Sequence, residues 1–278
     1  MGSDAPIGVF DSGVGGLTVA REIMRQIPGE RIVYFGDTAR VPYGSKSKDT
    51  IIGFSQQIAK FLRTKDVKAI VIACNTASAF ALETLSKEND IPVIGVVKPG
   101  AKVAAETTQN GRIGVIGTLG TVNSNIYSEY IREINPELQV FSKACPLFVP
   151  LVEEGWLYDS ITVEVADRYF SELKGYDIDT LVLGCTHYPL IRHTLQKVIG
   201  EQVNLVNPAY ETAISLKKVL QKKGLLRETA LEGSLREGGL RQEHEFYVSD
   251  GAEKFKAFAN TILPCEVIET HDINIEKY

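Results

Sequence analysis

Two cysteines of this chain each follow a short apolar run that is rich in β-branched residues. The first run is AIVIACNTAS (residues 69–78), and the second is TLVLGCTHYP (residues 180–189). A continuous apolar run of this length predicts a parallel strand that is buried on both faces. Open α/β sheets bind their ligands just beyond the carboxyl ends of such strands. We therefore expect Cys74 and Cys185, each followed by polar residues, to lie at two ligand-binding strand ends.

Two thiols that face each other across a cleft can invert a carbon centre. One group removes a proton from one side of the carbon and the other returns a proton on the opposite side, because each base must reach its proton within hydrogen-bond distance. A thiol suits both roles, since its reference pKa of about 8.5 lies close to neutral pH. On this hypothesis Asp11 assists Cys74, and His187 or Glu153 assists Cys185, as proton relays or orienting partners.

Three other functions compete with this hypothesis. A cysteine hydrolase would pair Cys185 with His187, but Pro189 indicates that the strand ends before these side chains can share a face. A redox dithiol would need two sulfurs almost in contact, with Cβ atoms about 4 Å apart. A binding module without catalytic activity would have no use for the second cysteine. Inversion uses both cysteines and is preferred, and the remaining Cys145 and Cys265 fit small buried hydrophobic residues.

The composition is that of an ordinary soluble globular protein. The 278 residues can bury a large core and predict two domains of moderate size. The net charge of −5 gives no basic field for nucleic acid or a membrane surface, and no stretch approaches the roughly 20 apolar residues of a membrane span. The start, MGSDAPIGVF, lacks the charged and apolar regions of a signal peptide, so we expect a cytoplasmic protein. The four scattered cysteines contain no C-x-x-C pair, and we expect no metal site.

The N-terminal segment predicts a strand, a glycine-rich loop and a helix. An apolar strand at residues 7–10 precedes DSGVGG (residues 11–16), and apolar residues then recur at helical spacing until the Pro28-Gly29 pair. The loop is not a dinucleotide fingerprint, because Thr18 occupies the position of the last glycine, and it does not end in Gly-Lys-Ser/Thr. Its free backbone N–H groups at a helix start suit an anion such as a carboxylate.

The second strand leads into the polar segment TARVPYGSKS (residues 38–47). Loops of this composition often carry function. Here Pro42, Tyr43 and Gly44 would offer a ring and backbone N–H groups at the edge of the sheet. A helix is predicted to follow, with Ser47 as its N-cap.

The chain contains a weak internal repeat. IGVIGT (residues 113–118) copies IGVFDS (residues 7–12), and the two cysteine runs recur at nearly the same interval. Matching intervals indicate two similar α/β halves that face each other. The further elements predicted are strands at 91–97, 138–142 and 203–206 and helices at 123–134, 160–174 and 211–223.

The C-terminal part is expected to complete the first half. Residues 227–244 are polar and predict a surface loop. Strands at 245–248 and 265–268 flank one more amphipathic helix, and they should rejoin the first half because the second copy already has its own strands. The predicted domains are therefore 1–97 plus 208–278, and 98–207.

Four motifs resemble those of a known family. GVFDSGVGGLTV, GDTARVPYG, IACNTAS and LGCTHYP are similar to the motifs of the cofactor-independent glutamate racemases, and the similarity extends over essentially the whole chain. The resemblance implies two pseudo-symmetric open α/β domains, flavodoxin-like with mostly parallel sheets, and an active site in the cleft between them. It implies interconversion of L- and D-glutamate without metal or pyridoxal phosphate, which supplies D-glutamate for bacterial peptidoglycan, and it suggests a homodimer.

The resemblance also implies a set of site residues. Cys74 would take the proton from D-glutamate and Cys185 from L-glutamate, and Glu153 would assist by analogy. The substrate-binding positions implied are Asp11, Ser12, Pro42, Tyr43, Gly44, Asn75, Thr76, Thr118, Thr121, Thr186 and His187. Aspartate and hydantoin racemases also use paired cysteines, so they remain alternatives for the substrate. Some family members are regulated by a cell-wall precursor through an N-terminal extension, and with few residues before the first strand we expect no such regulation here.

Overall fold

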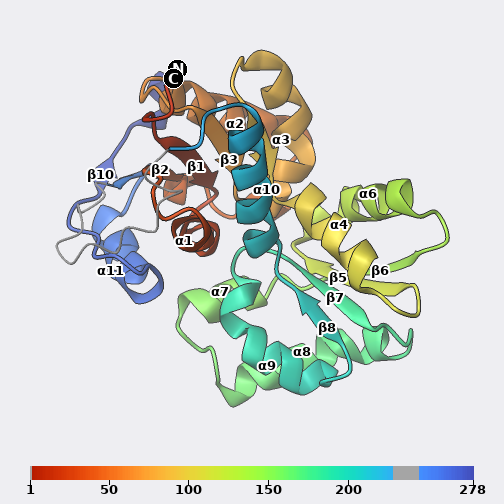
Figure 1. Cartoon of the computed structure of the whole chain (residues 1–278). Coiled ribbons are helices and arrows are strands. Elements are labelled where there is room, and N and C mark those ends of the chain that lie inside the picture. The colour runs from red at the N-terminus through yellow and green to blue at the C-terminus, as the bar shows by residue number, and fades with distance from the viewer. Residues whose placement is uncertain (1, 228–243) are drawn as a thin grey trace, which may run out of the picture.

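The computed structural model describes residues 2–227 and 244–278, and it contains two parallel β-sheets (Figure 1). The first sheet has the strand order β10-β9-β2-β1-β3-β4, and the second has the order β6-β5-β7-β8. The strands are β1 (Ile7–Asp11), β2 (Ile32–Gly36), β3 (Ala69–Ile72), β4 (Val93–Gly95), β5 (Arg112–Gly117), β6 (Gln139–Ala144), β7 (Thr180–Gly184), β8 (Asn204–Val206), β9 (Glu245–Val248) and β10 (His271–Asp272). The loop predicted at 227–244 lies almost wholly outside the described residues.

The two sheets repeat one topology. The order β2-β1-β3-β4 in the first sheet corresponds strand by strand to β6-β5-β7-β8 in the second, and the paired strands run parallel. This correspondence confirms the two similar α/β halves predicted from the repeat. It also makes β3 and β7, which precede the two cysteines, equivalent strands. All residues of both strands are buried, as expected for the interior of a parallel sheet.

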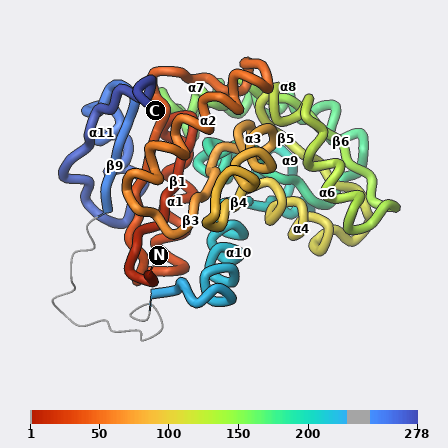
Figure 2. The backbone as a smooth tube through the Cα atoms, turned by 90° about the horizontal axis from the view of Figure 1, so that it is seen from above, coloured from red at the N-terminus to blue at the C-terminus, as the bar shows by residue number. Residues whose placement is uncertain are grey.

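Helices cover the sheets and join the two halves. In Figure 1, α10 runs between the red and orange first half and the yellow and green second half, and Figure 2 shows the halves side by side from above. The helices are α1 (Leu17–Gln26), α2 (Lys48–Arg63), α3 (Asn75–Glu88), α4 (Val97–Thr107), α5 (Leu119–Asn123), α6 (Ile126–Ile134), α7 (Phe148–Glu153), α8 (Ser160–Lys174), α9 (Arg192–Ile199), α10 (Pro208–Lys222) and α11 (Ala252–Ile262). Short 3-10 turns are η1 (Thr38–Arg40), η2 (Tyr43–Ser45), η3 (Tyr188–Ile191) and η5 (Ile275–Lys277).

Capping side chains define the starts of α2 and α10, and the first of these caps agrees with the sequence prediction. Ser47 accepts a hydrogen bond from the Thr50 N–H at 3.3 Å, which confirms it as the N-cap of α2. The predicted helix at 211–223 begins earlier, at Pro208, because Asn207 caps the Ala209 N–H at 3.1 Å and proline suits the first helical position.

Two further predicted elements differ in the structure. The helix expected at 123–134 is divided into α5 and α6 by Asn125, whose φ of 57° is left-handed, a conformation that asparagine tolerates. The strand expected at 91–97 is shorter, since β4 ends at Gly95 and α4 begins at Val97.

The strand predicted at 265–268 is wrong. These residues are irregular, and the two-residue strand β10 lies just beyond them. The reason is local, because the Val267 N–H donates to Asn260 Oδ1 at 2.8 Å and the Val267 carbonyl accepts from Asn260 Nδ2 at 3.4 Å. The backbone is thus bonded to a side chain of α11 instead of a neighbouring strand. As predicted, the strand at 245–248 (β9) joins the first sheet beside β2, and β10 extends this sheet beyond β9.

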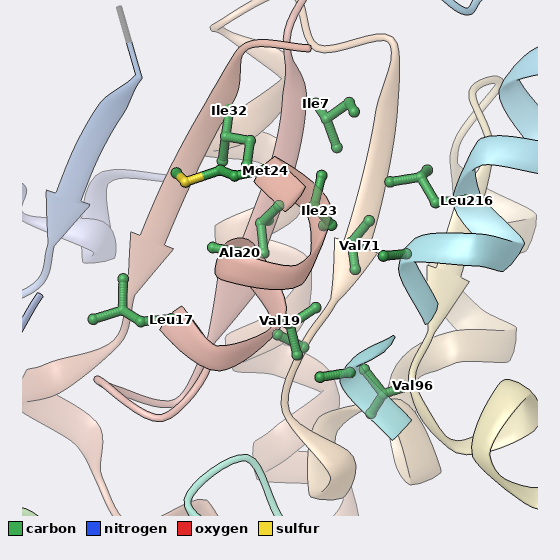
Figure 3. Close-up of a cluster of buried hydrophobic side chains, with 14 of the residues drawn as sticks. Ile7, Leu17, Val19, Ala20, Ile23, Met24, Ile32, Val71, Val96 and Leu216 are labelled. Carbon is green, nitrogen blue, oxygen red and sulfur yellow. The ribbon is translucent and has the colours of Figure 1, made fainter. Parts of the chain in front are cut away.

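A hydrophobic cluster crosses from one half to the other. Figure 3 shows side chains of α1, including Val19 and Ile23, close to Val71 of β3 and Leu216 of α10. The same cluster contains Val115 and other residues of the second sheet. Because α10 contacts both α1 and α4, it holds the halves together. We keep 1–97 plus 208–278 and 98–207 as the proposed domains.

Shortening Leu216 should weaken this connection. The side chain is fully buried, so Leu216→Ala removes apolar contacts and leaves a cavity, which is expected to lower the free energy of unfolding by about 2–5 kcal/mol. Lys218→Ala, at an exposed position of the same helix, is the matched control and should change stability little. Urea unfolding followed by circular dichroism measures both. Equal midpoints for the two variants would contradict the role given to α10.

Candidate active site

Both predicted cysteines lie at equivalent strand ends and line one cavity. Cys74 follows β3 and is the N-cap residue of α3, and Cys185 follows β7. Each is 6% exposed. They share a cavity of about 480 Å³ whose wall comes from both halves of the chain.

Most of the predicted site residues line this cavity. They are Ser12, Pro42, Tyr43, Gly44, Cys74, Asn75, Thr76, Thr118, Glu153, Cys185, Thr186 and His187. Two predicted residues, Asp11 and Thr121, are buried behind the wall. The lining residues that sequence reasoning missed are Val41, Ser45, Leu119, Pro146, Val149 and Pro150. Three of these six, Val41, Ser45 and Leu119, directly adjoin a predicted residue, so their neighbourhood in sequence could have indicated them.

The neighbourhood of Cys185 contains two further polar groups. Its sulfur lies 3.8 Å from His187 Nδ1, and His187 Nε2 lies 3.0 Å from Glu153 Oε1. Burial lowers the pKa of His187, but the hydrogen bonds with Cys185 and Glu153 and the charges of Cys185 and Asp11 outweigh it and raise the pKa to about 10. The hydrogen bond to His187 in turn lowers the pKa of Glu153. A protonated imidazole therefore lies between a carboxylate and the sulfur, where its charge stabilises a thiolate.

The sequence argument that separated Cys185 from His187 is wrong. The strand does end at Gly184, as Pro189 indicates, but the chain then turns instead of extending. The Tyr188 N–H donates to the Cys185 carbonyl at 3.2 Å, and this turn brings the imidazole back to the sulfur.

Cys74 has a different environment. Burial, followed by the charge of Asp11, raises the pKa of the thiol to about 12, although hydrogen bonds with Ala77 and Ser12 act in the opposite direction. Asp11 is itself fully buried, and burial raises its pKa. Its Oδ2 accepts from the N–H groups of Gly13 and Gly16 at 3.1 and 3.0 Å, whereas Oδ1 has no hydrogen-bond partner. At neutral pH this raised pKa keeps the Cys74 thiol protonated and neutral.

Hydroxyl groups from both halves meet at the wall of the cavity. Thr76 Oγ1, at the start of α3, lies 2.8 Å from Thr118 Oγ1 and 3.2 Å from Thr121 Oγ1. Thr118 also caps α5 by accepting from the Thr121 N–H at 3.2 Å. Thr118 follows β5 as Ser12 follows β1, so the repeat places hydroxyls at equivalent strand ends. These groups can donate to an anionic ligand.

The amide of Asn75 is oriented by the other half. The hydroxyl of Tyr127, on α6, donates to Asn75 Oδ1 at 2.7 Å, and both side chains are buried. Because the oxygen accepts this bond, the Asn75 NH₂ group is the part available to a ligand. Nothing in the sequence pattern indicated Tyr127, since it lies on an amphipathic helix among ordinary core residues.

Glycines permit the close approach of the two halves. A Cβ atom added to Gly15 would lie 2.5 Å from His187 Nδ1 and closer still to Thr186 Oγ1. One added to Gly44 would lie 2.6 Å from Thr118 Cβ. In both cases a first-half glycine touches a second-half site residue, so a larger residue would push the walls apart.

The described part of the chain offers no grouped metal ligands. Across residues 2–227 and 244–278, no set of three or more His, Cys, Asp or Glu side chains is arranged to hold a metal ion. In the same residues, no helix is long and apolar enough to span a membrane.

Comparison with known proteins decides the family. Residues 7–213 match the family model described as Asp/Glu/Hydantoin racemase. A glutamate racemase of Geobacter metallireducens is 48% identical over 270 residues, which cover 97% of each chain. This chain belongs to the Asp/Glu/Hydantoin racemase family.

Solved structures of this racemase family share the whole fold. A glutamate racemase of Bacillus anthracis matches with a TM-score of 0.90 at 40% identity and 98% coverage of each chain. The glutamate racemase of Francisella tularensis, in complex with D-glutamate, also has a TM-score of 0.90, at 39% identity, and the match covers 99% of this chain and 100% of that one. These matches confirm the predicted two-domain α/β fold.

Removing the charge of Glu153 should make His187 easier to deprotonate. The carboxylate stabilises the imidazolium, so Glu153→Gln is expected to lower the pKa of His187 from about 10. Titration of the histidine ring signals by NMR, assigned with a His187→Asn variant, measures the change. Glu154→Gln, at the exposed neighbouring position, is the matched control. An unchanged His187 titration in Glu153→Gln would show that the observed contact does not control the protonation.

Adding one methyl group at Gly15 should damage the site. In Gly15→Ala the new Cβ would collide with His187 and Thr186 and displace them. We expect kcat to fall about tenfold or more, because a rise of about 1.4 kcal/mol in the activation free energy already lowers the rate tenfold. Gly53→Ala is the control, because nothing lies within 4 Å of a Cβ at that position in α2. That variant should be fully active and no less stable. Normal turnover in Gly15→Ala would contradict the close approach.

Proposed function

We propose that this protein is a glutamate racemase that interconverts L- and D-glutamate by proton removal and return at Cα. The observation that supports this most directly is the presence of two cysteines, at topologically equivalent strand ends, in one cavity between the repeated halves. Relatives named glutamate racemases at 48% identity over 97% of the chain support glutamate as the substrate over aspartate or a hydantoin.

The unequal environments of the two sulfurs suit one direction of the reaction. The Cys185 thiolate, beside protonated His187, takes the α-proton of L-glutamate, so that the C–H bond breaks and an S–H bond forms. The electron pair left on Cα takes a proton from the neutral Cys74 thiol on the opposite face, which gives D-glutamate. The reverse reaction begins with Cys74 as the thiolate. Asp11, whose charge acts on both Cys74 and His187, assists the exchange of protons.

Neutral donors hold the substrate. The hydroxyls of Ser12, Thr76, Thr118 and Thr186 and the amide of Asn75 line the cavity, with Thr121 supporting them from behind. The N-terminus of the 14-residue helix α3 adds backbone N–H groups beside Cys74, where an anionic carboxylate is favoured. Pro42, Tyr43 and Gly44 form the facing wall.

The contact between Cys185 and His187 gives a cysteine hydrolase a specific observation in its favour. However, a hydrolase needs only one nucleophilic thiol, so this function does not explain why Cys74 lies in the same cavity. The racemase therefore remains the better proposal.

The biological setting follows from the family resemblance. We propose that the enzyme needs no cofactor, acts in the cytoplasm and supplies D-glutamate for peptidoglycan. The homodimer stays a prediction.

Replacing either cysteine by serine should abolish most racemisation. A serine hydroxyl is a far weaker acid than a thiol, so both Cys74→Ser and Cys185→Ser are expected to lose at least about 100-fold in kcat, the typical contribution of a positioned acid or base. Circular dichroism of L- and of D-glutamate solutions, without added cofactor, measures turnover. Cys265→Ser, outside the cavity, is the control and should be fully active.

The same assay distinguishes the alternatives. Loss of optical rotation with L-aspartate but not with L-glutamate would refute the choice of substrate. A fully active Cys74→Ser or Cys185→Ser variant would refute the two-base mechanism. In D₂O, the wild-type enzyme should place deuterium at Cα of the product.

A further inference from the structure

The buried carboxylate of Asp37, just after β2, is hydrogen-bonded to Tyr43, which lines the cavity together with Pro42 and Gly44. Its side chain is fully buried and accepts hydrogen bonds from three side chains. Arg40 Nε donates to its two oxygens at 2.9 and 2.7 Å, and Ser249 Oγ donates to Oδ1 at 2.8 Å. The Tyr43 hydroxyl donates to Oδ2. Burying a charged group is costly unless it is paired and hydrogen-bonded. The buried Asp37 side chain therefore holds its three donor side chains in place, and they hold it.

The Arg40 side chain is fixed from a second direction. Its Cζ atom lies 3.9 Å from the ring centroid of Phe54, and its Nη1 donates to Gln57 Oε1 at 2.5 Å. Both partners lie on α2, which packs on the first half. The ion pair between Arg40 and Asp37 is thus tied to a long helix and does not depend on the loop alone.

Ser249 brings the C-terminal segment into this network. It lies just beyond β9, which pairs with β2. Besides donating to Asp37, its Oγ accepts from the Ala39 N–H at 2.8 Å. The next residue, Asp250, donates its N–H to Thr38 Oγ1 at 3.0 Å, and the Thr38 hydroxyl donates to the Asp250 carbonyl. The residues just after β9 are therefore hydrogen-bonded to residues 37–39, the start of the turn that leads to the cavity.

This hydrogen-bond network determines which groups of Tyr43 are available to a ligand. This residue lines the cavity although only 1% of it is exposed, and its hydroxyl is occupied by Asp37. It can therefore offer a ligand its ring and backbone, but not its hydroxyl. The adjoining Gly44 lies against Thr118 of the other half, so a small displacement of this wall alters the cavity.

We propose that Asp37, Arg40 and Ser249 are positioning residues that set the Pro42–Gly44 wall for the substrate. By this arrangement the C-terminal segment takes part in substrate binding without touching the substrate. The effect on substrate affinity rests on the proposed racemase function, whereas the effect on the wall itself does not.

Ser249→Ala tests the proposal with little disturbance, since it removes one hydroxyl from a partly exposed position. We expect KM for glutamate to rise about fivefold, the effect of one hydrogen bond, while kcat changes less than about twofold. Ser249→Thr retains the hydroxyl and should restore KM. Tyr43→Phe removes the other end of the network and should raise KM in the same way. Thr261→Ala, which removes a hydroxyl bonded only within α11, should leave both constants unchanged.

Hydrogen exchange separates this proposal from the proposed function. The backbone amides of residues 38–46 should exchange faster in Ser249→Ala than in the wild type, with or without substrate, and those of Thr261→Ala should not. Failure of the wild type to racemise glutamate would refute the function and leave this measurement valid. Unchanged exchange in both Ser249→Ala and Tyr43→Phe, or a fall in kcat at constant KM, would overturn the positioning role.

Discussion

The contact between the carboxyl ends of two repeated sheets is the constraint on which the site depends. The carboxyl ends of parallel strands lie on one side of a sheet, so each half presents its polar loops on that side. The two halves meet through these loops. Thr76 of one half lies 2.8 Å from Thr118 of the other, and Gly15 lies against His187. Neither half alone encloses the cavity. The chemistry therefore needs both copies, and it needs the glycines at positions 15 and 44, where a side chain would collide with the other half.

Much of this arrangement could be predicted from the sequence. The buried cysteine strands, the repeat of IGVFDS in IGVIGT and the glycine loop each follow from local patterns, because a strand buried on both faces has a continuous apolar signature. The sheet edge then gathers the residues that follow those strands. Cys74 and Cys185 could be placed in one site for this reason, and the family resemblance added residues that no periodicity distinguishes, such as Thr121.

The remaining features depend on contacts between distant residues. The split at Asn125 and the irregular segment around Val267 arise from one left-handed residue and one asparagine side chain, and neither leaves a periodic signal. Tyr127 reaches Asn75 through tertiary packing alone. The turn after Gly184 returns His187 to the sulfur, whereas the expected end of the strand before Pro189 predicts separation. Local patterns place the strands well, but the polar contacts that tune the site are set by how the two halves meet.

The route of the chain through the first sheet has a consequence for synthesis on the ribosome. The second half is one continuous stretch of chain between β4 and α10, and it can form its sheet as soon as that stretch has emerged. The first sheet is completed later, because β9 pairs with β2 only after residues 245–248 have been made. The second copy of the repeat can thus form its sheet before the first sheet is complete, and the hydrogen bonds of Ser249 with Asp37 and Ala39 form only after that.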